Sequence, residues 1–218
     1  MQTKHKLPIF LILLFHISGF IGMCCTPYMQ WFLNNTPLNL LVAFFSIFIS
    51  IPNKTLNFYK ISLFIAIFGW LVEYIGITTF LPFGKYDYRN SIMGVQFLGV
   101  PLMLGANWWL QVYAYGTIAD IGVGAFVKTN KYNILIKSLF AAFLMVVSDI
   151  PMEILANKIG LWYWHEGSAP LQNYVGWFAY GFLLQIVCHY YQIFEKNSVA
   201  IVYAATTTLF FWGLVAFL

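Results

Sequence analysis

Charged residues are scarce in this sequence. Only 8% of its 218 residues are Asp, Glu, Lys or Arg, whereas 61% are hydrophobic; a typical soluble domain has about 25% charged residues. This scarcity excludes a water-soluble domain, and the high hydrophobic content excludes an intrinsically disordered chain. The composition therefore predicts an all-α, polytopic helical bundle that lies in a membrane and forms a single transmembrane domain over residues 1–218.

Cysteine is also rare, and its three positions form no metal-binding pattern. Cys24 and Cys25 are adjacent and Cys188 lies in an apolar run, so the C-x-x-C spacing of a metal site is absent. The net charge of +4 is small and scattered along the chain. We therefore expect no metal site and no nucleic-acid partner.

Seven long apolar runs, separated by turn-forming residues, predict seven transmembrane helices. Lys4 and Lys6 before the first run resemble the start of a signal peptide, but we expect this run to be retained as a first span. The predicted spans are Leu7–Met23, Pro37–Ile51, Phe58–Thr78, Phe97–Ala119, Ile134–Ala156, Tyr174–Phe194 and Ser198–Phe217.

The distribution of basic residues predicts the orientation of these spans. With the N-terminus inside, the cytoplasmic side holds eight basic residues and the other side three, as the positive-inside rule requires. We expect the protein in a bacterial inner (cytoplasmic) membrane with its N-terminus inside. The eight are Lys4, Lys6, Lys54, Lys60, Lys128, Lys131, Lys137 and Lys196, and the three are Lys85, Arg89 and Lys158.

Three acidic residues, Glu73, Asp149 and Glu153, fall inside predicted spans. An ionisable group within a membrane costs several kcal/mol and marks a functional site by default. Asp149 and Glu153 are four residues apart, so they share one face of a helix. The predicted topology places all three acids in the outer half of the membrane, and we expect them to be the catalytic residues.

Two loops rich in polar and aromatic residues emerge on the same outer side, at residues 82–89 and 162–174. We expect these loops, together with Asn107 and Trp108 of the fourth predicted span, to bind the substrate. The predicted binding residues are Tyr86, Asp87, Tyr88, Arg89, Asn107, Trp108, Trp162, Trp164, His165, Gln172 and Asn173.

Each of these features also has a purely structural interpretation. Tyr and Trp at helix ends often form an interfacial belt, and a buried acid or Asn107 can join two helices by a hydrogen bond. Lys85, Asp87 and Arg89 could form a solvated, salt-bridged loop. Three acids at one depth favour a site over these alternatives.

Two known chemistries of helical membrane proteins do not fit the sequence. A retinal photoreceptor needs a lysine inside its last span, and residues 198–217 contain none. A prenyltransferase of the UbiA type needs two aspartate-rich motifs, whereas only the pair Asp149 and Glu153 is present.

Chemistry on a wholly apolar substrate fits better. A carboxyl group buried in lipid favours its neutral form and can act as a general acid. Protonating a trisubstituted alkene leaves a tertiary carbocation, which aromatic faces stabilise; 20% of the residues are aromatic. A second carboxylate could then deprotonate the water that captures the cation.

Several motifs together resemble the membrane carotenoid biosynthesis family, which includes the CruF-type carotenoid 1',2'-hydratases and the bisanhydrobacterioruberin hydratases. The resemblance is strongest over residues 70–178, and the sequence at 170–174 is similar to the Bacteroidota branch. The motifs are EYIG (73–76), PFGKYDY (82–88), GVPL (99–102), NW (107–108), the pair Asp149 and Glu153, WYW (162–164), Gly167, PLQNY (170–174) and GWF (176–178).

The resemblance implies a hydratase that adds water across the terminal 1,2 double bond of a linear ψ-end carotenoid such as lycopene or γ-carotene. Such a reaction needs no cofactor, and its partners would be the carotenoid and membrane lipid; the oligomeric state stays open. In our hypothesis Asp149 or Glu153 donates the proton, and Glu73 positions water or balances the cation.

Around these acids, we expect Tyr86, Tyr88, Trp162 and Trp164 to form the walls of the end-group pocket, with Arg89 or His165 tuning the acids. A lycopene cyclase, a proton-coupled transporter and a carotenoid-binding subunit are the alternatives.

Overall fold

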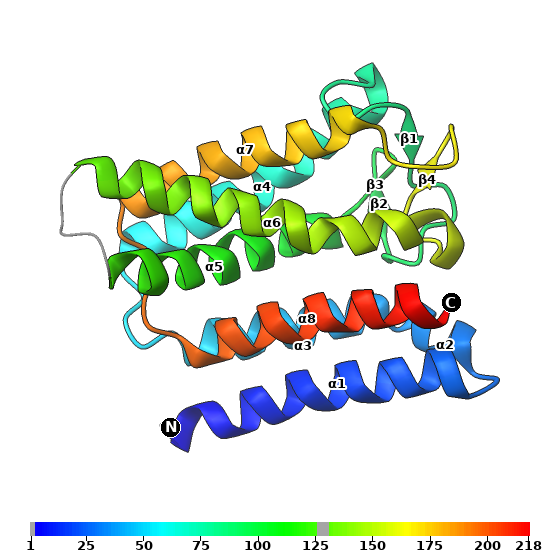
Figure 1. Ribbon diagram of the computed structural model, residues 1–218, viewed down its shortest axis with the longest axis horizontal. Coiled ribbons are helices and arrows are strands. Elements are labelled where there is room, and N and C mark those ends of the chain that lie inside the picture. Colours follow the sequence, from blue (N-terminus) through cyan, green and yellow to red (C-terminus); the bar gives the residue numbers. More distant parts are fainter. Residues whose placement is uncertain (1–2, 126–130) are drawn as a thin grey trace.

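The computed structural model describes residues 3–125 and 131–218, and within them eight α-helices follow a short 3-10 turn at Thr3–His5. Seven of the helices are long and run back and forth along one direction (Figure 1). The helices are α1 (Lys6–Cys25), α2 (Met29–Asn34), α3 (Thr36–Ser50), α4 (Leu56–Thr79), α5 (Met103–Gly124), α6 (Lys131–Ile159), α7 (Leu171–Tyr190) and α8 (Ser198–Phe217).

Within the described residues, four helical segments are long and apolar enough to cross a membrane: α1, α4, α8 and Asn133–Ile159 of α6. Helix α3 is apolar but has only 15 residues. Helices α5 and α7 carry buried amides such as Gln111 and Gln185, which lower their hydropathy. The all-α membrane fold predicted from composition is confirmed, and the seven-span topology stays a prediction.

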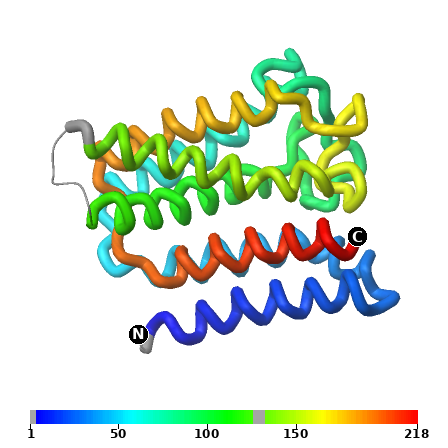
Figure 2. The backbone as a smooth tube through the Cα atoms, viewed as in Figure 1, coloured from blue at the N-terminus to red at the C-terminus, as the bar shows by residue number. Residues whose placement is uncertain are grey.

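The long helices form successive layers. Helix α5 packs against α3, α4, α6, α7 and α8 and is the centre of the bundle. Helix α1 packs mainly against α3 and α8 and lies at the edge, as Figure 2 shows. The tightest helix pairs, α6 with α7, α5 with α6 and α4 with α5, therefore hold the part of the bundle that carries all three intramembrane acids.

The start of α5 and the end of α7 are among the helix boundaries that differ from those predicted. Helix α5 begins at Met103 because the preceding residues form a β-hairpin, in which β2 (Gln96–Phe97) pairs with β3 (Val100–Pro101) around a turn at Leu98 and Gly99, both with positive φ. Helix α7 ends at Tyr190, shortly before Gln192, whose positive φ of 52° breaks the helix. Apolar composition alone does not reveal these turns.

The two polar loops meet at one end of the bundle. Strand β1 (Tyr86–Asp87) pairs antiparallel with β4 (Tyr163–Trp164), so that Tyr86 lies opposite Trp164. The last residues of α4 and α6 and the first residues of α5 and α7 lie at the same end (Figure 1). This junction positions the candidate site.

Candidate active site

Glu73 lies on α4 six residues before its end, and its side chain is buried, with 3% exposure. Its Oε2 accepts hydrogen bonds from the hydroxyls of Tyr86 (2.6 Å) and Tyr88 (2.7 Å). Its Oε1 accepts one from the indole Nε1 of Trp108 on α5 (3.0 Å). Tyr86 and Tyr88 reach the same carboxylate because side chains two residues apart in an extended segment lie on one face.

Glu153, on α6, is bound in a similar way. Its Oε2 accepts hydrogen bonds from the indoles of Trp162 (2.9 Å) and Trp164 (2.6 Å), which are again two residues apart. Its Oε1 accepts one from the Nδ2 of Asn173 on α7 (2.7 Å). Each carboxylate thus has three uncharged donors, an arrangement that satisfies a buried anion without a cation.

The pairing of β1 with β4 brings the two carboxylate clusters side by side. The rings of Tyr86 and Trp164 lie 5.0 Å apart. Burial, then the negative charge of Glu73, raises the pKa of both Tyr86 and Tyr88 well above the ordinary value of 10.0. Both hydroxyls therefore remain donors at neutral pH.

Asp149 lies one turn before Glu153 and is fully buried. Among the described residues neither of its carboxyl oxygens has a hydrogen-bond partner, although it interacts electrostatically with Glu153 and Glu73. An unpaired carboxylate in an apolar interior costs several kcal/mol, so these surroundings suit a neutral acid. Asp149 lines neither of the cavities described below.

Glu73 and Glu153 face a common small cavity of about 10 Å³, which Asn107 and Asn173 also line. A water molecule needs a cavity of about 10–15 Å³ and two to four polar partners. Asn107 is 7% exposed, and no hydrogen bond of its side-chain amide is found among the described residues. Its amide can therefore bind a molecule in this cavity.

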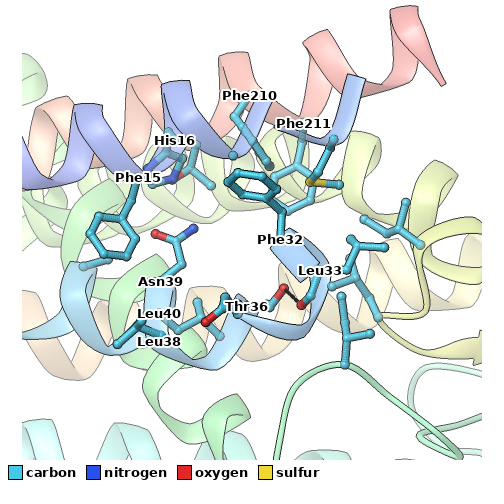
Figure 3. Close-up of a pocket in the computed structure, with 18 of the residues that line it drawn as sticks. Phe15, His16, Phe32, Leu33, Thr36, Leu38, Asn39, Leu40, Phe210 and Phe211 are labelled. Atoms are coloured by element: carbon cyan, nitrogen blue, oxygen red, sulfur yellow. Dashed lines mark hydrogen bonds between the residues drawn. The ribbon is translucent and has the colours of Figure 1, made fainter. Parts of the chain in front are cut away.

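A second, much larger cavity of about 520 Å³ adjoins the small one, because Asn107 and Trp162 line both. Its remaining walls come mostly from α1, α2, α3 and α8 and are largely apolar (Figure 3). This cavity was not predicted from the sequence, because most of its lining residues are apolar side chains without a chemical signature.

Four predicted binding residues lie apart from the carboxylates. Asp87 accepts hydrogen bonds from Arg89 Nη2 (2.6 Å) and Nε (2.9 Å), and His165 Nε2 lies 2.9 Å from the same carboxylate. Although partial burial acts in the opposite direction, these contacts lower the pKa of Asp87 to about 2. Gln172 donates to the carbonyl of Phe80 (3.1 Å). These four side chains hold together the two polar loops at the site end of the bundle.

Two further residues support the site and were not predicted. The ring of Trp177 stacks on Trp108 with centroids 4.2 Å apart. The side-chain amide of Asn157 donates a hydrogen bond to the backbone carbonyl of Trp164 (3.1 Å) and accepts one from its backbone N–H (2.8 Å). These two bonds hold β4 against α6. A sequence signal for Asn157 existed, because its position four residues after Glu153 places it on the same helix face.

A sequence model of carotenoid biosynthesis proteins matches residues 35–218. The chain belongs to the carotenoid biosynthesis protein family. The match contains every carboxylate and donor described above and gives the protein a role in carotenoid biosynthesis, whereas α1 and α2 precede it. No curated protein and no solved structure gives a significant match to the chain.

Proposed function

We propose that this member of the carotenoid biosynthesis family is a carotenoid hydratase. It adds water across the terminal 1,2 double bond of a linear ψ-end carotenoid of the lycopene or γ-carotene type. The observation that carries the proposal is the junction of two cavities: one has room for about one water between two carboxylates, and the other is large and apolar.

In the proposed first step, the carboxylate of Glu153 takes a proton from Asp149 and passes it to C2 of the terminal alkene. The new C–H bond uses the π electrons, and a tertiary carbocation forms at C1. Asp149 lies directly behind Glu153 on the same helix face and supplies the proton to it. Because Asp149 lines neither cavity, it acts through Glu153 rather than on the substrate.

In the second step, water in the small cavity forms the C–O bond at C1 and passes a proton to Glu73. Asn107 orients this water with its free amide. The proton then returns from Glu73 across the small cavity to Glu153 and from Glu153 to Asp149, so no proton is gained or lost over the cycle. The three donors to Glu73 hold it as an anion beside the cation while the alkene is protonated.

Aromatic side chains surround the position of the cation. The indole N–H groups of Trp162 and Trp164 donate hydrogen bonds to Glu153. Trp108 donates one to Glu73 and is stacked on Trp177. Ring faces of this kind stabilise a cation by about 0.5–2 kcal/mol each when water is excluded.

The polar groups that line the small cavity also support hydration over cyclisation. A cyclase starts from the same protonated alkene but captures the cation with the polyene itself, so it needs no site for water. A cavity formed by two carboxylates and two amides at the reacting position instead supplies a water molecule, a base to deprotonate it and groups to orient it.

Expression in a bacterial host that accumulates lycopene tests the proposal. We expect a product heavier by one water, with an unchanged chromophore and a tertiary hydroxyl, detected by mass spectrometry of the extracted pigments. An isomer of unchanged mass with a shifted absorption would instead indicate a cyclase. If lycopene and γ-carotene both return unchanged from well-expressed protein, the hydratase proposal is wrong.

A further inference from the structure

The cavity of about 520 Å³ lies on the side of the bundle where α1 packs against α3 and α8. Figure 3 shows Phe15, Phe32, Phe210 and Phe211 around this space, with the side chain of Asn39 extending into it. The buried His16 here is already satisfied, since its Nε2 lies 3.0 Å from the Thr207 hydroxyl. The cavity therefore suits a ligand that is almost entirely hydrocarbon.

One side of this cavity is bordered by exposed residues from three different helices. Leu14 of α1 is 45% exposed, Trp31 of α2 61% and Leu38 of α3 48%. These side chains are apolar, and α1 is apolar enough to span a membrane. The border between α1 and α3 is thus the side from which a molecule dissolved in the bilayer can reach the cavity.

Another part of the cavity wall reaches the carboxylate site. Trp162 lines the large cavity, and its indole nitrogen bonds Glu153. Asn107 lines both cavities, and its neighbour Trp108 bonds Glu73. A chain that enters between α1 and α3 therefore ends beside both carboxylates.

We propose that this cavity binds the linear isoprenoid end of the carotenoid substrate, which enters sideways from the lipid between α1 and α3. The identity of the reacting end rests on the proposed function. A polyene is insoluble in water, so the loop end, covered by Asp87, Arg89 and His165, offers it no route. Helix α1, outside the matched family range, is in this proposal a wall of the substrate site.

Filling the cavity at Gly19 tests the proposal. Gly19 lines the cavity on α1, and a Cβ there would meet only the ring of Phe210, at 3.5 Å, which is ordinary contact. Gly19→Leu should fill the space beside Phe210, whereas Gly19→Ala adds too little volume to do so. Both raise helix propensity, so a difference between them reports cavity volume. Gly122→Leu is the matched control, because Gly122 on α5 has nothing within 4 Å and lines neither cavity.

Binding is measured with lycopene added to the purified full-length protein in detergent, as retained pigment per protein and as quenching of tryptophan fluorescence. We expect Gly19→Leu to lower lycopene affinity at least tenfold, and Gly19→Ala and Gly122→Leu to keep it. Unchanged affinity in a Gly19→Leu variant that melts and elutes like the wild type would overturn the proposal. Should that variant misfold, Ser18→Trp decides in the same assay, because Ser18 is an exposed residue of α1 that lines the same cavity. We expect it to lower lycopene affinity at least tenfold, and unchanged affinity would overturn the proposal.

Hydration is scored separately, so the two proposals can fail independently. If the wild type binds lycopene and loses it in Gly19→Leu but forms no hydrated product, the binding site stands and the hydratase proposal fails. If Gly19→Leu binds and hydrates lycopene as the wild type does, only the binding site is wrong.

Discussion

At the scale of single residues, the three acids have very different surroundings. Glu73 and Glu153 each accept three hydrogen bonds from uncharged donors, whereas Asp149 has none among the described residues. Hydrogen bonds from donors favour the ionised form, and burial without donors favours the neutral form. In the proposed mechanism, one helix face therefore places a neutral Asp149 one turn before the carboxylate of Glu153, which lines the small cavity.

This difference predicts the effect of neutralising each acid on α6. Glu153→Gln removes the group that touches the alkene and should lower the hydration rate by about 100-fold or more, the usual contribution of a general acid. Asp149→Asn should lower the rate less, because it removes only the supply of the proton, and should leave lycopene binding unchanged. Conversion of lycopene by purified protein, followed by chromatography, measures both rates.

Glu166→Gln serves as the control, since Glu166 is an exposed acid in the loop on the same side. Full activity of Glu153→Gln would exclude Glu153 as the donor. An Asp149→Asn variant slower than Glu153→Gln would show that Asp149 acts on the substrate directly.

The hydroxyl donors to Glu73 carry a second prediction. Tyr86→Phe removes a 2.6 Å hydrogen bond to the carboxylate, and a bond to a charged group contributes about 1.5–3 kcal/mol. We expect the hydration rate to fall about tenfold, with little change in lycopene affinity, because the phenyl ring remains. Tyr74→Phe is the control, since no hydrogen bond from its hydroxyl is found among the described residues. A fall in affinity as large as the fall in rate would mean that Tyr86 acts mainly in binding.

At the scale of secondary-structure elements, two short strands organise the site. Each supplies donors two residues apart to one carboxylate, and their antiparallel pairing sets Tyr86 against Trp164. Asn157 attaches β4 to α6, and the hydroxyl of Tyr86 reaches back to α4. The loops are thus part of the active site rather than connections between spans.

Helix α4 must present a residue without a side chain where Tyr86 approaches it. A Cβ at Gly76 would collide with the hydroxyl of Tyr86 and lie 3.2 Å from the ring of Phe83. Gly76→Ala should therefore displace the Tyr86 hydroxyl from Glu73 and lower the hydration rate at least tenfold, despite the higher helix propensity of alanine. The rate and the melting temperature are compared with those of Gly122→Ala, a position with open space. A Gly76→Ala variant with the activity of Gly122→Ala would contradict the contact.

The sequence predicted the long helices well because lipid requires each apolar run to satisfy its own backbone hydrogen bonds. It also singled out Glu73, Asp149 and Glu153, since acids within a membrane are costly. It did not predict α2, the β1–β4 pairing or the support from Asn157, which depend on contacts between distant segments. The cavity bounded by α1 was not predicted for a different reason: in the sequence, its leucines and phenylalanines cannot be distinguished from lipid-facing residues.

At the scale of the whole molecule, the site lies at one end of an asymmetric bundle. The loops at 80–102 and 160–170 lie at the same end (Figure 1), and the loop at 191–197 at the opposite end. Basic residues in the sequence are concentrated toward that opposite end, which the positive-inside rule assigns to the cytoplasm. The carboxylates would then lie near the outer face, and the polyene would extend from there into the bilayer.

Cysteine labelling in intact cells measures this orientation directly. In a background with Cys24, Cys25 and Cys188 replaced by serine, a Glu166→Cys variant should react with a membrane-impermeant maleimide, because Glu166 is exposed at the site end. A Lys196→Cys variant, exposed at the other end, should react only after the cells are opened. The reverse pattern would place the site at the cytoplasmic face, and hydration would then occur on the side where the basic residues lie. Labelling of both from outside would mean that α7, the helix between them, does not cross the membrane, and the predicted seven-span topology would be wrong.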